Sequence, residues 1–166
     1  MEVTFTKVEG GRYVMAASGI PGPALAPTQG PGYDEFLPHD VVHFLVENEA
    51  GLAGGVFGRV AAGRSTLFPT ADPRERRHHR RRVAKQQLTG SEHEDMARSE
   101  LLAGVCPPLW ELRTGRRRQP PEWFTSFDPE ILESPLVQRV LGRLDDFAAR
   151  WAALPVGETI TLLWTG

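Results

Sequence analysis

Both ends of the chain alternate apolar and polar side chains, a pattern typical of strands that bury one face. Residues 2–8 and 12–17 flank Gly10 and Gly11, a pair that suits the turn of a β-hairpin. Residues 158–164 repeat the alternation at the other end of the chain. Because an isolated hairpin is only marginally stable, we predict that the last strand joins it. One small antiparallel sheet would then hold both ends of the chain.

A strongly amphipathic helix is predicted between Ser134 and Pro155. Serine is favoured as an N-cap, and Pro135 suits the first helical position. The helix presents an apolar stripe with helical period, formed by Val137, Val140, Leu141, Leu144, Ala148 and Trp151. A sheet and helices that each have one apolar face must bury those faces against each other. We therefore predict an α+β fold in which the N-terminal hairpin and the C-terminal strand pack against a helical layer.

The length of 166 residues fits a single domain, residues 1–166. The chain holds 17 glycines and 14 prolines, which is enough to indicate long loops. These residues and the charged runs concentrate near 18–36, 64–90 and 113–130. We expect mobile loops in those three segments.

A second helix, predicted over residues 38–50, carries the side chains best suited to metal binding or acid–base chemistry. Pro38 suits its first turn and Gly51 the residue after its last turn. At 100° per residue, His43 lies about 40° from His39 around the helix, and Asp40 about 100°. The opposite side is apolar. With Glu47 at about 80°, two imidazoles and two carboxylates therefore share one narrow polar stripe.

Two histidines four residues apart can bind one ion, as in zinc helices of the HExxH type. We therefore predict that His39 and His43 ligate a divalent metal ion, most simply zinc. Asp40 would act as the catalytic base on a metal-bound water, or would orient a ligand. Glu47 is excluded as the third ligand because it lies about 12 Å along the axis from His39. Two alternatives remain open, namely a merely solvated polar face and metal-free acid–base chemistry.

The third ligand should come from another segment. Ser91 and Glu94 have the spacing of a capping box, which predicts a helix from residue 92 to about Gly104. His93 and Glu100 lie on that helix. If it packs against the histidine-bearing helix, His93 would complete the site, with Glu100 as the alternative. An exposed position for His93 in the first turn is the competing interpretation.

The segment from Pro38 to Gly58 resembles a family of uncharacterised small bacterial proteins with the pattern PHDxxHFxVE followed by GLxxGxxG. Its HDxxH core is also similar to the metal motif of a protein family of ubiquinone biosynthesis. The second resemblance implies a bound metal and a lyase reaction. That family has a glutamate twelve residues after the second histidine, where this chain has Gly55. From the residues alone, the glycines near position 55 predict a tight turn into a short helix, with Gly58 allowing close packing.

The formal net charge of −2 conceals two basic stretches. Residues 74–85 contain seven basic residues and one acidic residue, and residues 113–118 contain four basic residues and no acidic one. We expect solvated loops in both places. The alternative is a module that binds an anionic partner, either a phosphorylated ligand or a nucleic acid. Nucleic acid is the less favoured partner, because Arg74–Arg82 is not part of a recognition motif and has no interleaved aromatic residues.

The single cysteine, Cys106, precludes an internal disulfide and favours a reducing compartment. No apolar run approaches the roughly 20 residues needed to cross a bilayer, and the first residues lack the pattern of a secretory signal. We therefore expect a cytoplasmic protein without membrane contact. The function predicted from the sequence is a metal-dependent hydrolase acting on an unidentified small molecule. The oligomeric state stays open, with a homodimer among the options.

Overall fold

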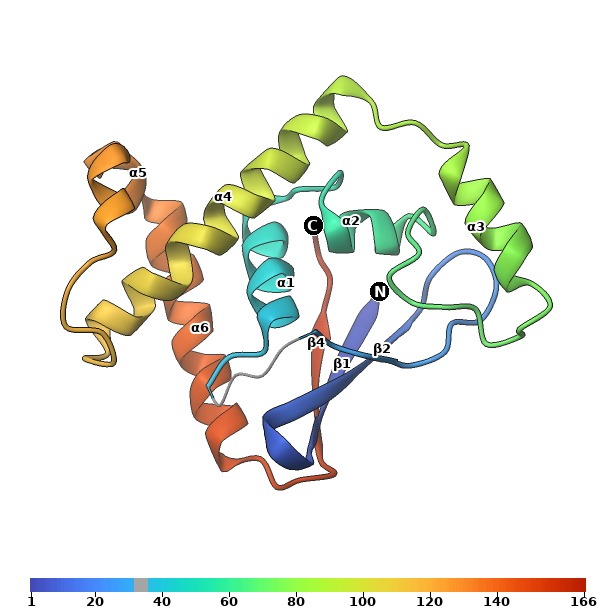
Figure 1. Ribbon diagram of the computed structural model, residues 1–166, viewed down its shortest axis with the longest axis horizontal. Helices are drawn as coiled ribbons and strands as arrows, with labels where there is room; N and C mark the ends of the chain where they lie inside the picture. The colour runs from blue at the N-terminus through green and yellow to red at the C-terminus, as the bar shows by residue number, and fades with distance from the viewer. Residues whose placement is uncertain (32–35) are drawn as a thin grey trace.

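The computed structural model describes residues 1–31 and 36–166, and it has the predicted α+β architecture (Figure 1). The sheet is antiparallel, with the strand order β3-β2-β1-β4. Its strands are β1 (Glu2–Val8), β2 (Arg12–Ser18), β3 (Thr28–Gln29) and β4 (Thr159–Leu163). The C-terminal strand pairs with β1, where Phe5 lies opposite Ile160. The predicted joining of the two chain ends is thus confirmed.

The turn of the hairpin is one residue longer than predicted. Val8 pairs with Arg12, and the short 3-10 helix η1 (Glu9–Gly11) connects the two strands. Gly10 and Gly11 have φ values of 71° and 69°, a left-handed conformation that glycine adopts without steric cost. The glycine pair therefore does make the turn, but Glu9 belongs to it as well.

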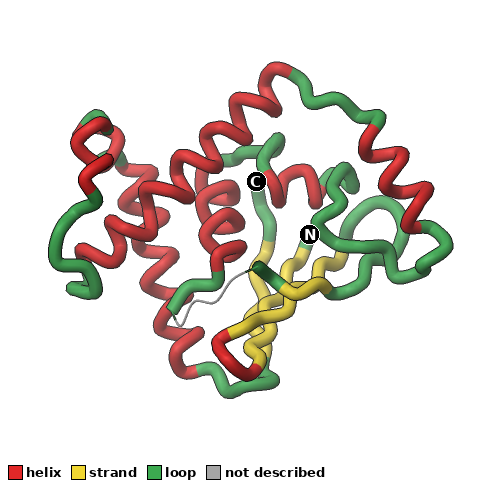
Figure 2. Tube along the Cα trace, in the orientation of Figure 1, coloured by secondary structure: helices red, strands yellow, loops and turns green. Residues whose placement is uncertain are grey.

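A helical layer covers one face of the sheet (Figure 2). Its centre is formed by α1, α4 and α6, which pack against one another, with α2 beside α1. The remaining helices lie toward the periphery. The helices are α1 (His39–Ala50), α2 (Val56–Ala61), α3 (Arg76–Ala84), α4 (Gly90–Arg113), η2 (Glu122–Ser126), α5 (Pro129–Leu132) and α6 (Pro135–Ala153). None of the helices described is both long and apolar enough to cross a bilayer.

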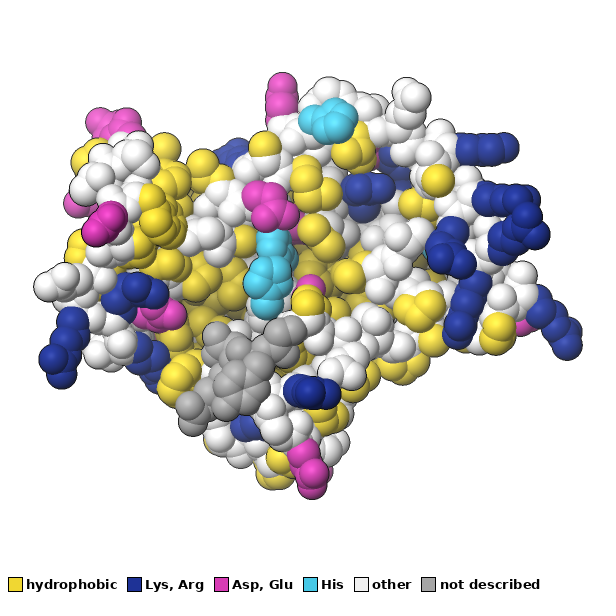
Figure 3. Space-filling view, in the orientation of Figure 1, with side chains coloured by type: hydrophobic (Ala, Val, Ile, Leu, Met, Phe, Trp, Pro, Cys, Tyr) yellow, Lys and Arg dark blue, Asp and Glu magenta, His cyan; other side chains and the backbone are white. Residues whose placement is uncertain are grey.

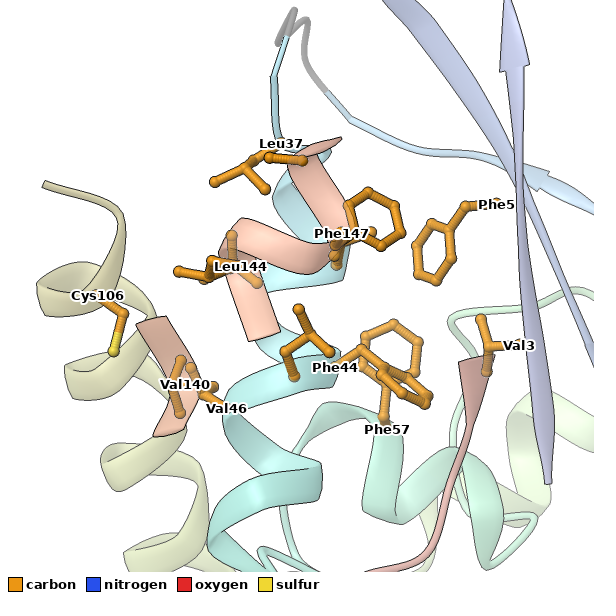
Figure 4. Packing of buried hydrophobic residues seen from close by; sticks show 14 of the residues in the cluster. Val3, Phe5, Leu37, Phe44, Val46, Phe57, Cys106, Val140, Leu144 and Phe147 are labelled. Atoms are coloured by element: carbon orange, nitrogen blue, oxygen red, sulfur yellow. The ribbon is translucent and has the colours of Figure 1, made fainter. Parts of the chain in front are cut away.

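Aromatic side chains join the sheet to the helical layer (Figure 4). Phe5 of β1 makes edge-to-face contacts with Phe44 of α1 and Phe147 of α6, at ring-centroid distances of 6.5 and 6.1 Å. Phe57 of α2 packs on Phe44 at 5.2 Å. Such pairs add to the burial of large apolar surface. The core therefore lies where α1 and α6 meet the sheet.

The predicted amphipathic helix is α6. Its N-cap is Ser134, whose hydroxyl accepts a hydrogen bond from the backbone N–H of Val137, and Pro135 is its first residue. At its other end, the Lys7 ammonium of β1 donates to the carbonyl oxygens of Trp151 and Leu154, at 2.8 and 3.1 Å. A cation at a helix C-terminus satisfies carbonyls that have no helical partner.

Helix α4 is longer at both ends than predicted. It continues through Pro107 and Pro108 to Arg113, although each proline removes a backbone donor. Tertiary packing holds the last turns, because Trp110 is buried and its indole N–H donates to Asp145 of α6 at 2.7 Å. A helix ending near Gly104 was therefore the wrong prediction. The prolines are tolerated because burial offsets their local cost.

The capping box at the start of α4 also differs from the prediction. Thr89, not Ser91, is the N-cap, and its partner is Glu92. The Thr89 hydroxyl accepts from the Glu92 backbone N–H, and the Glu92 carboxylate accepts from the Thr89 backbone N–H at 2.8 Å. Glu92 also forms an ion pair with Arg64. Thr89 with Glu92 and Ser91 with Glu94 both match the capping-box pattern. The box that forms is the one whose glutamate, Glu92, also pairs with Arg64.

The segments predicted as loops contain some regular structure. Residues 18–36 include the short strand β3, and positions 32–35 of that segment lie outside the described residues. Residues 113–130 contain η2 and the start of α5. Residues 64–90 contain α3, nine residues long, which the sequence conceals because its only buried positions are His79 and Val83. So short an apolar stripe gives no helical period to detect.

Candidate functional site

The polar stripe predicted on α1 is divided between the surface and the interior. The helix runs from His39 to Ala50, as predicted, and Gly51 ends it in a left-handed conformation with φ 65°. His39 is exposed, whereas Asp40, His43 and Glu47 are 6%, 6% and 0% exposed. A simple solvated face would leave all of them accessible. Three of the four side chains are instead built into the interior, where each needs a polar partner.

His39 and His43 lie next to each other at the boundary between interior and surface. Their ring centroids are 4.9 Å apart and their planes are inclined by 54°. Figure 3 shows histidine side chains reaching the surface over α1 next to an acidic side chain. The predicted pairing of two imidazoles across one helical turn is therefore present in the structure.

Asp40 is fixed to the sheet. The phenolic hydroxyl of Tyr13, on β2, donates to Oδ2 of Asp40 at 2.5 Å, and the Asp40 backbone N–H donates to the same Tyr13 oxygen at 3.3 Å. Asp40 was predicted to act as a base or to orient its neighbours. A buried carboxylate held by a short hydrogen bond fits the orienting role better, because Tyr13 fixes the position of Oδ2.

A hydrogen-bonded chain runs from His43 through Ser99 of α4 to Glu47. The Ser99 hydroxyl donates to Oε1 of Glu47 at 2.6 Å. Its oxygen lies 3.1 Å from Nδ1 of His43. Since a hydroxyl has one proton to donate, Ser99 accepts from Nδ1–H of His43. This selects the tautomer in which Nε2 carries the free lone pair.

Burial lowers the pKa of His43 below its ordinary value, and the neighbouring His39 lowers it further. The carboxylates of Glu100 and Asp40 oppose this effect by favouring the imidazolium. The net effect keeps His43 neutral near pH 7, because burial disfavours the charged form. A neutral imidazole with its Nδ1 proton engaged is the form that ligates a metal or accepts a proton through Nε2.

Glu47 occupies the N-terminus of α2. Its carboxylate accepts hydrogen bonds from the backbone N–H groups of Val56, Phe57 and Gly58, at 2.8, 2.7 and 3.4 Å. Val56 and Ser99 donate to Oε1, and Phe57 and Gly58 donate to Oε2. Burial raises the pKa of Glu47, while the four hydrogen bonds act in the opposite direction. Glu47 is thus a structural anion held at a helix N-terminus, in agreement with its exclusion as a metal ligand.

The glycines before α2 make room for this arrangement. A Cβ atom on Gly55 would lie 2.7 Å from each oxygen of the Glu47 carboxylate. A Cβ on Gly58 would collide with the backbone carbonyls of Leu52 and Ala53. The predicted tight turn into a short helix is confirmed, with Gly58 in close contact. The space beside position 55 is thus occupied by the carboxylate of Glu47.

The structure does not bring His93 to the histidine pair. His93 is exposed in the first turn of α4 and lies about 120° around that helix from Ser99. Glu100 is on the same helix next to Ser99, and its charge acts on His43. Among residues 1–31 and 36–166 no group of three histidine, cysteine or acidic side chains is arranged to hold a metal ion. The site therefore has two imidazoles side by side, and neither His93 nor Glu100 completes a group of three donors with them within the described residues.

Two residues of the candidate site, Tyr13 and Ser99, were not predicted from the sequence. Tyr13 was predicted only as part of the strand over residues 12–17, and no local signal indicated that its hydroxyl would bind Asp40. Ser99 shares one face of α4 with Leu102 and Cys106, all of them buried. A serine in an otherwise apolar stripe is the signal that would have identified it, because a buried hydroxyl requires a partner.

His79, the other buried histidine, has a structural role. Its Nε2–H donates to the carbonyl oxygen of Ser65 at 3.0 Å, and its Nδ1 accepts from Arg82 at 3.1 Å. Both ring nitrogens are therefore engaged.

Comparison with family models, with curated proteins and with solved structures finds no match to this chain. These comparisons therefore assign no function to the site.

Proposed function

We propose that His39 and His43 form an open site for a divalent metal ion, with zinc as the first candidate, and that the protein is a metal-dependent hydrolase. The observation that carries this proposal is the hydrogen bond from Nδ1–H of His43 to Ser99. Histidines that ligate a metal through one ring nitrogen almost always donate from the other to a fixed acceptor. Here that acceptor is itself anchored by the Glu47 carboxylate.

The donor set fits zinc in part. Catalytic zinc sites have three protein ligands and one open position. His39 and His43 supply two nitrogens, and the carboxylate of Glu100, whose charge acts on His43, is the candidate for a third donor. Glu100 is exposed, so its side chain is free to change rotamer without disturbing the core. A His₂Glu set of this kind is known for hydrolytic zinc.

The residues of the chain would have separate tasks around such an ion. The hydrogen bond to Ser99 fixes the tautomer of His43, and the hydrogen bond from Tyr13 positions Asp40. His39 faces solvent, where a small substrate can reach it. A divalent ion would supply Lewis acidity toward a substrate carbonyl or phosphoryl oxygen. Hydrolysis is the simplest reaction class for an open site with these features. The resemblance to the ubiquinone-biosynthesis family supports a lyase reaction as the alternative.

Metal binding to protein prepared without a histidine tag tests this proposal. Equilibrium dialysis with Zn²⁺ should give one ion per chain, and Co²⁺ should produce the visible absorption of a nitrogen- and oxygen-ligated site. His39→Ala should abolish both signals. Because the exposed side chain of His39 makes no hydrogen bond found among the described residues, its removal should leave the fold intact.

His78→Ala is the matched control, since His78 is an exposed histidine on α3. It should bind one ion with unchanged affinity. Wild-type protein that takes up no zinc, or a His39→Ala variant that binds as the wild type does, would contradict the assignment.

A further inference from the structure

Helix α3 presents arginines on every side that is not buried. At 100° per residue, its outward positions fall into three rows that run along the helix. One row holds Arg76 and Arg80, the outermost row Arg77 and Arg81, and the third His78 and Arg82. All six side chains are exposed. In Figure 3, dark blue side chains gather over α3 at the edge of the molecule.

These cations lack acidic partners. Every ion pair found among residues 1–31 and 36–166 involves arginines outside 74–85. Residues 74–85 hold seven basic residues against the single carboxylate of Glu75, and this excess of like charge is electrostatically unfavourable. Such repulsion is relieved when an external anion binds. The surface is therefore complementary to a strong negative charge that the described chain itself does not supply.

Helix α3 contacts the body of the protein through its two buried residues. Val83 is buried, and Nε2–H of His79 donates to the carbonyl oxygen of Ser65 at 3.0 Å. A cavity of about 310 Å³ opens on one side, lined in part by Arg76 and Arg80. A second, of about 470 Å³, opens on the other side, where Arg74, His78 and Arg82 line it together with the acidic Glu75. Anionic groups can thus approach the helix along both flanks.

We propose that α3 binds the phosphate backbone of a nucleic-acid duplex without reading its sequence. Three parallel rows of cations suit a ligand with many phosphates at once better than one isolated phosphate. Arginine is the side chain best matched to phosphate because its guanidinium forms bidentate hydrogen bonds. Charge contacts of this kind supply most of the affinity in non-specific binding.

Two other polyanions fit the surface less well. Single strands are normally held by aromatic side chains on which bases stack, and α3 contains no aromatic residue. An anionic membrane surface normally receives an amphipathic helix with an apolar face. The two positions of α3 that are buried, His79 and Val83, already face the protein. A duplex needs neither feature.

Fluorescence anisotropy with a labelled 20-base-pair DNA duplex tests the proposal. The buffer contains EDTA, so that the outcome is independent of any metal bound by His39 and His43. Wild-type protein should bind, and the logarithm of its affinity should fall linearly with the logarithm of salt concentration. The variant Arg77→Ser, Arg80→Ser, Arg81→Ser should bind at least about tenfold more weakly, with a salt slope smaller by about three.

The variant Arg98→Ser, Arg118→Ser, Arg150→Ser is the matched control. It removes the same charge from three exposed arginines elsewhere, none of which forms an ion pair within the described residues. Its duplex affinity should stay within about twofold of the wild type. If both triple variants lose the same duplex affinity, the loss reflects net charge alone, and the proposal is overturned. Absence of duplex binding at 50 mM salt, or a preference for anionic lipid vesicles over the duplex, would do so as well.

Discussion

The carboxylate of Glu47 fills the space that a side chain at position 55 would need. Both of its oxygens would lie 2.7 Å from a Cβ atom on Gly55. The same carboxylate receives the backbone N–H groups at the start of α2 and the hydroxyl of Ser99. One buried anion therefore connects α1, α2 and α4, and it anchors the serine that orients His43.

Gly55→Ala should destabilise the protein by about 1–3 kcal/mol, because the added methyl group must displace a carboxylate that is held by four donors. Urea denaturation measures the change in the free energy of unfolding. Gly104→Ala provides the control, since a Cβ on Gly104 meets nothing within 4 Å and the residue is in the interior of α4. This control should stabilise by about 0.5–1 kcal/mol. Equal effects of the two changes would refute the steric account.

Glu47→Gln should cost about 2–3 kcal/mol in the free energy of unfolding. The amide group replaces one acceptor by a donor, which would then face a backbone N–H or the Ser99 hydroxyl. Glu49→Gln is the matched control, because Glu49 is on the same helix and pairs with Arg139 and Arg143 at the surface. Surface pairs of this kind contribute less than about 1 kcal/mol. A Glu47→Gln protein as stable as the Glu49→Gln protein would contradict the assignment.

Ser99→Ala should separate the orienting network from the histidine pair. Removal of the hydroxyl leaves Nδ1 of His43 and Oε1 of Glu47 without this partner, at a cost of about 1–3 kcal/mol. If His43 ligates zinc, the affinity for zinc should also fall by about 10- to 100-fold. Ser91→Ala, at an exposed position of the same helix, should change neither quantity appreciably. Unaltered zinc affinity in a folded Ser99→Ala protein would argue against a positioning role for Ser99.

Cys106 should be inert toward thiol reagents in the folded protein. Burial raises the pKa of the Cys106 thiol to about 12, so almost no thiolate, the reactive form, is present at pH 8. The side chain is also 0% exposed. Labelling with a chromogenic disulfide reagent should be slow in buffer and should reach one thiol per chain in denaturant. Rapid labelling of the native protein would show that α4 opens near its prolines.

Glu92 should titrate at a lower pH than an ordinary glutamate. Its pKa is lowered first by the backbone N–H of Thr89 and then by Arg64. A lowered folded-state pKa means that the contribution to stability is present above the unfolded-state pKa and is lost as the pH falls through the folded-state value. Carbon-detected NMR titration gives this pKa directly. In Arg64→Ser it should move back toward the ordinary value, and an unchanged pKa would remove Arg64 from the explanation.

Some features of the structure follow from signals that lie close together in the sequence. The strand alternation at both ends, the Ser134–Pro135 start of α6 and the Pro38 and Gly51 limits of α1 are all encoded within a few residues. Local backbone preferences and periodic burial decide such features, so they were predictable. The proximity of His39 and His43 is of the same kind, because one helical turn brings the two rings together wherever the helix lies.

The hydrogen-bond partners of the polar stripe on α1 were decided only by the tertiary structure. Ser99 lies 52 residues from Glu47 and 56 from His43, and Tyr13 lies 27 residues from Asp40 on a different element. The passage of α4 through two prolines depends in the same way on burial against α6. The physical reason is that an amino-acid pattern encodes what each segment can do alone. A buried polar group is instead satisfied by whichever donor or acceptor the packing of distant segments places beside it.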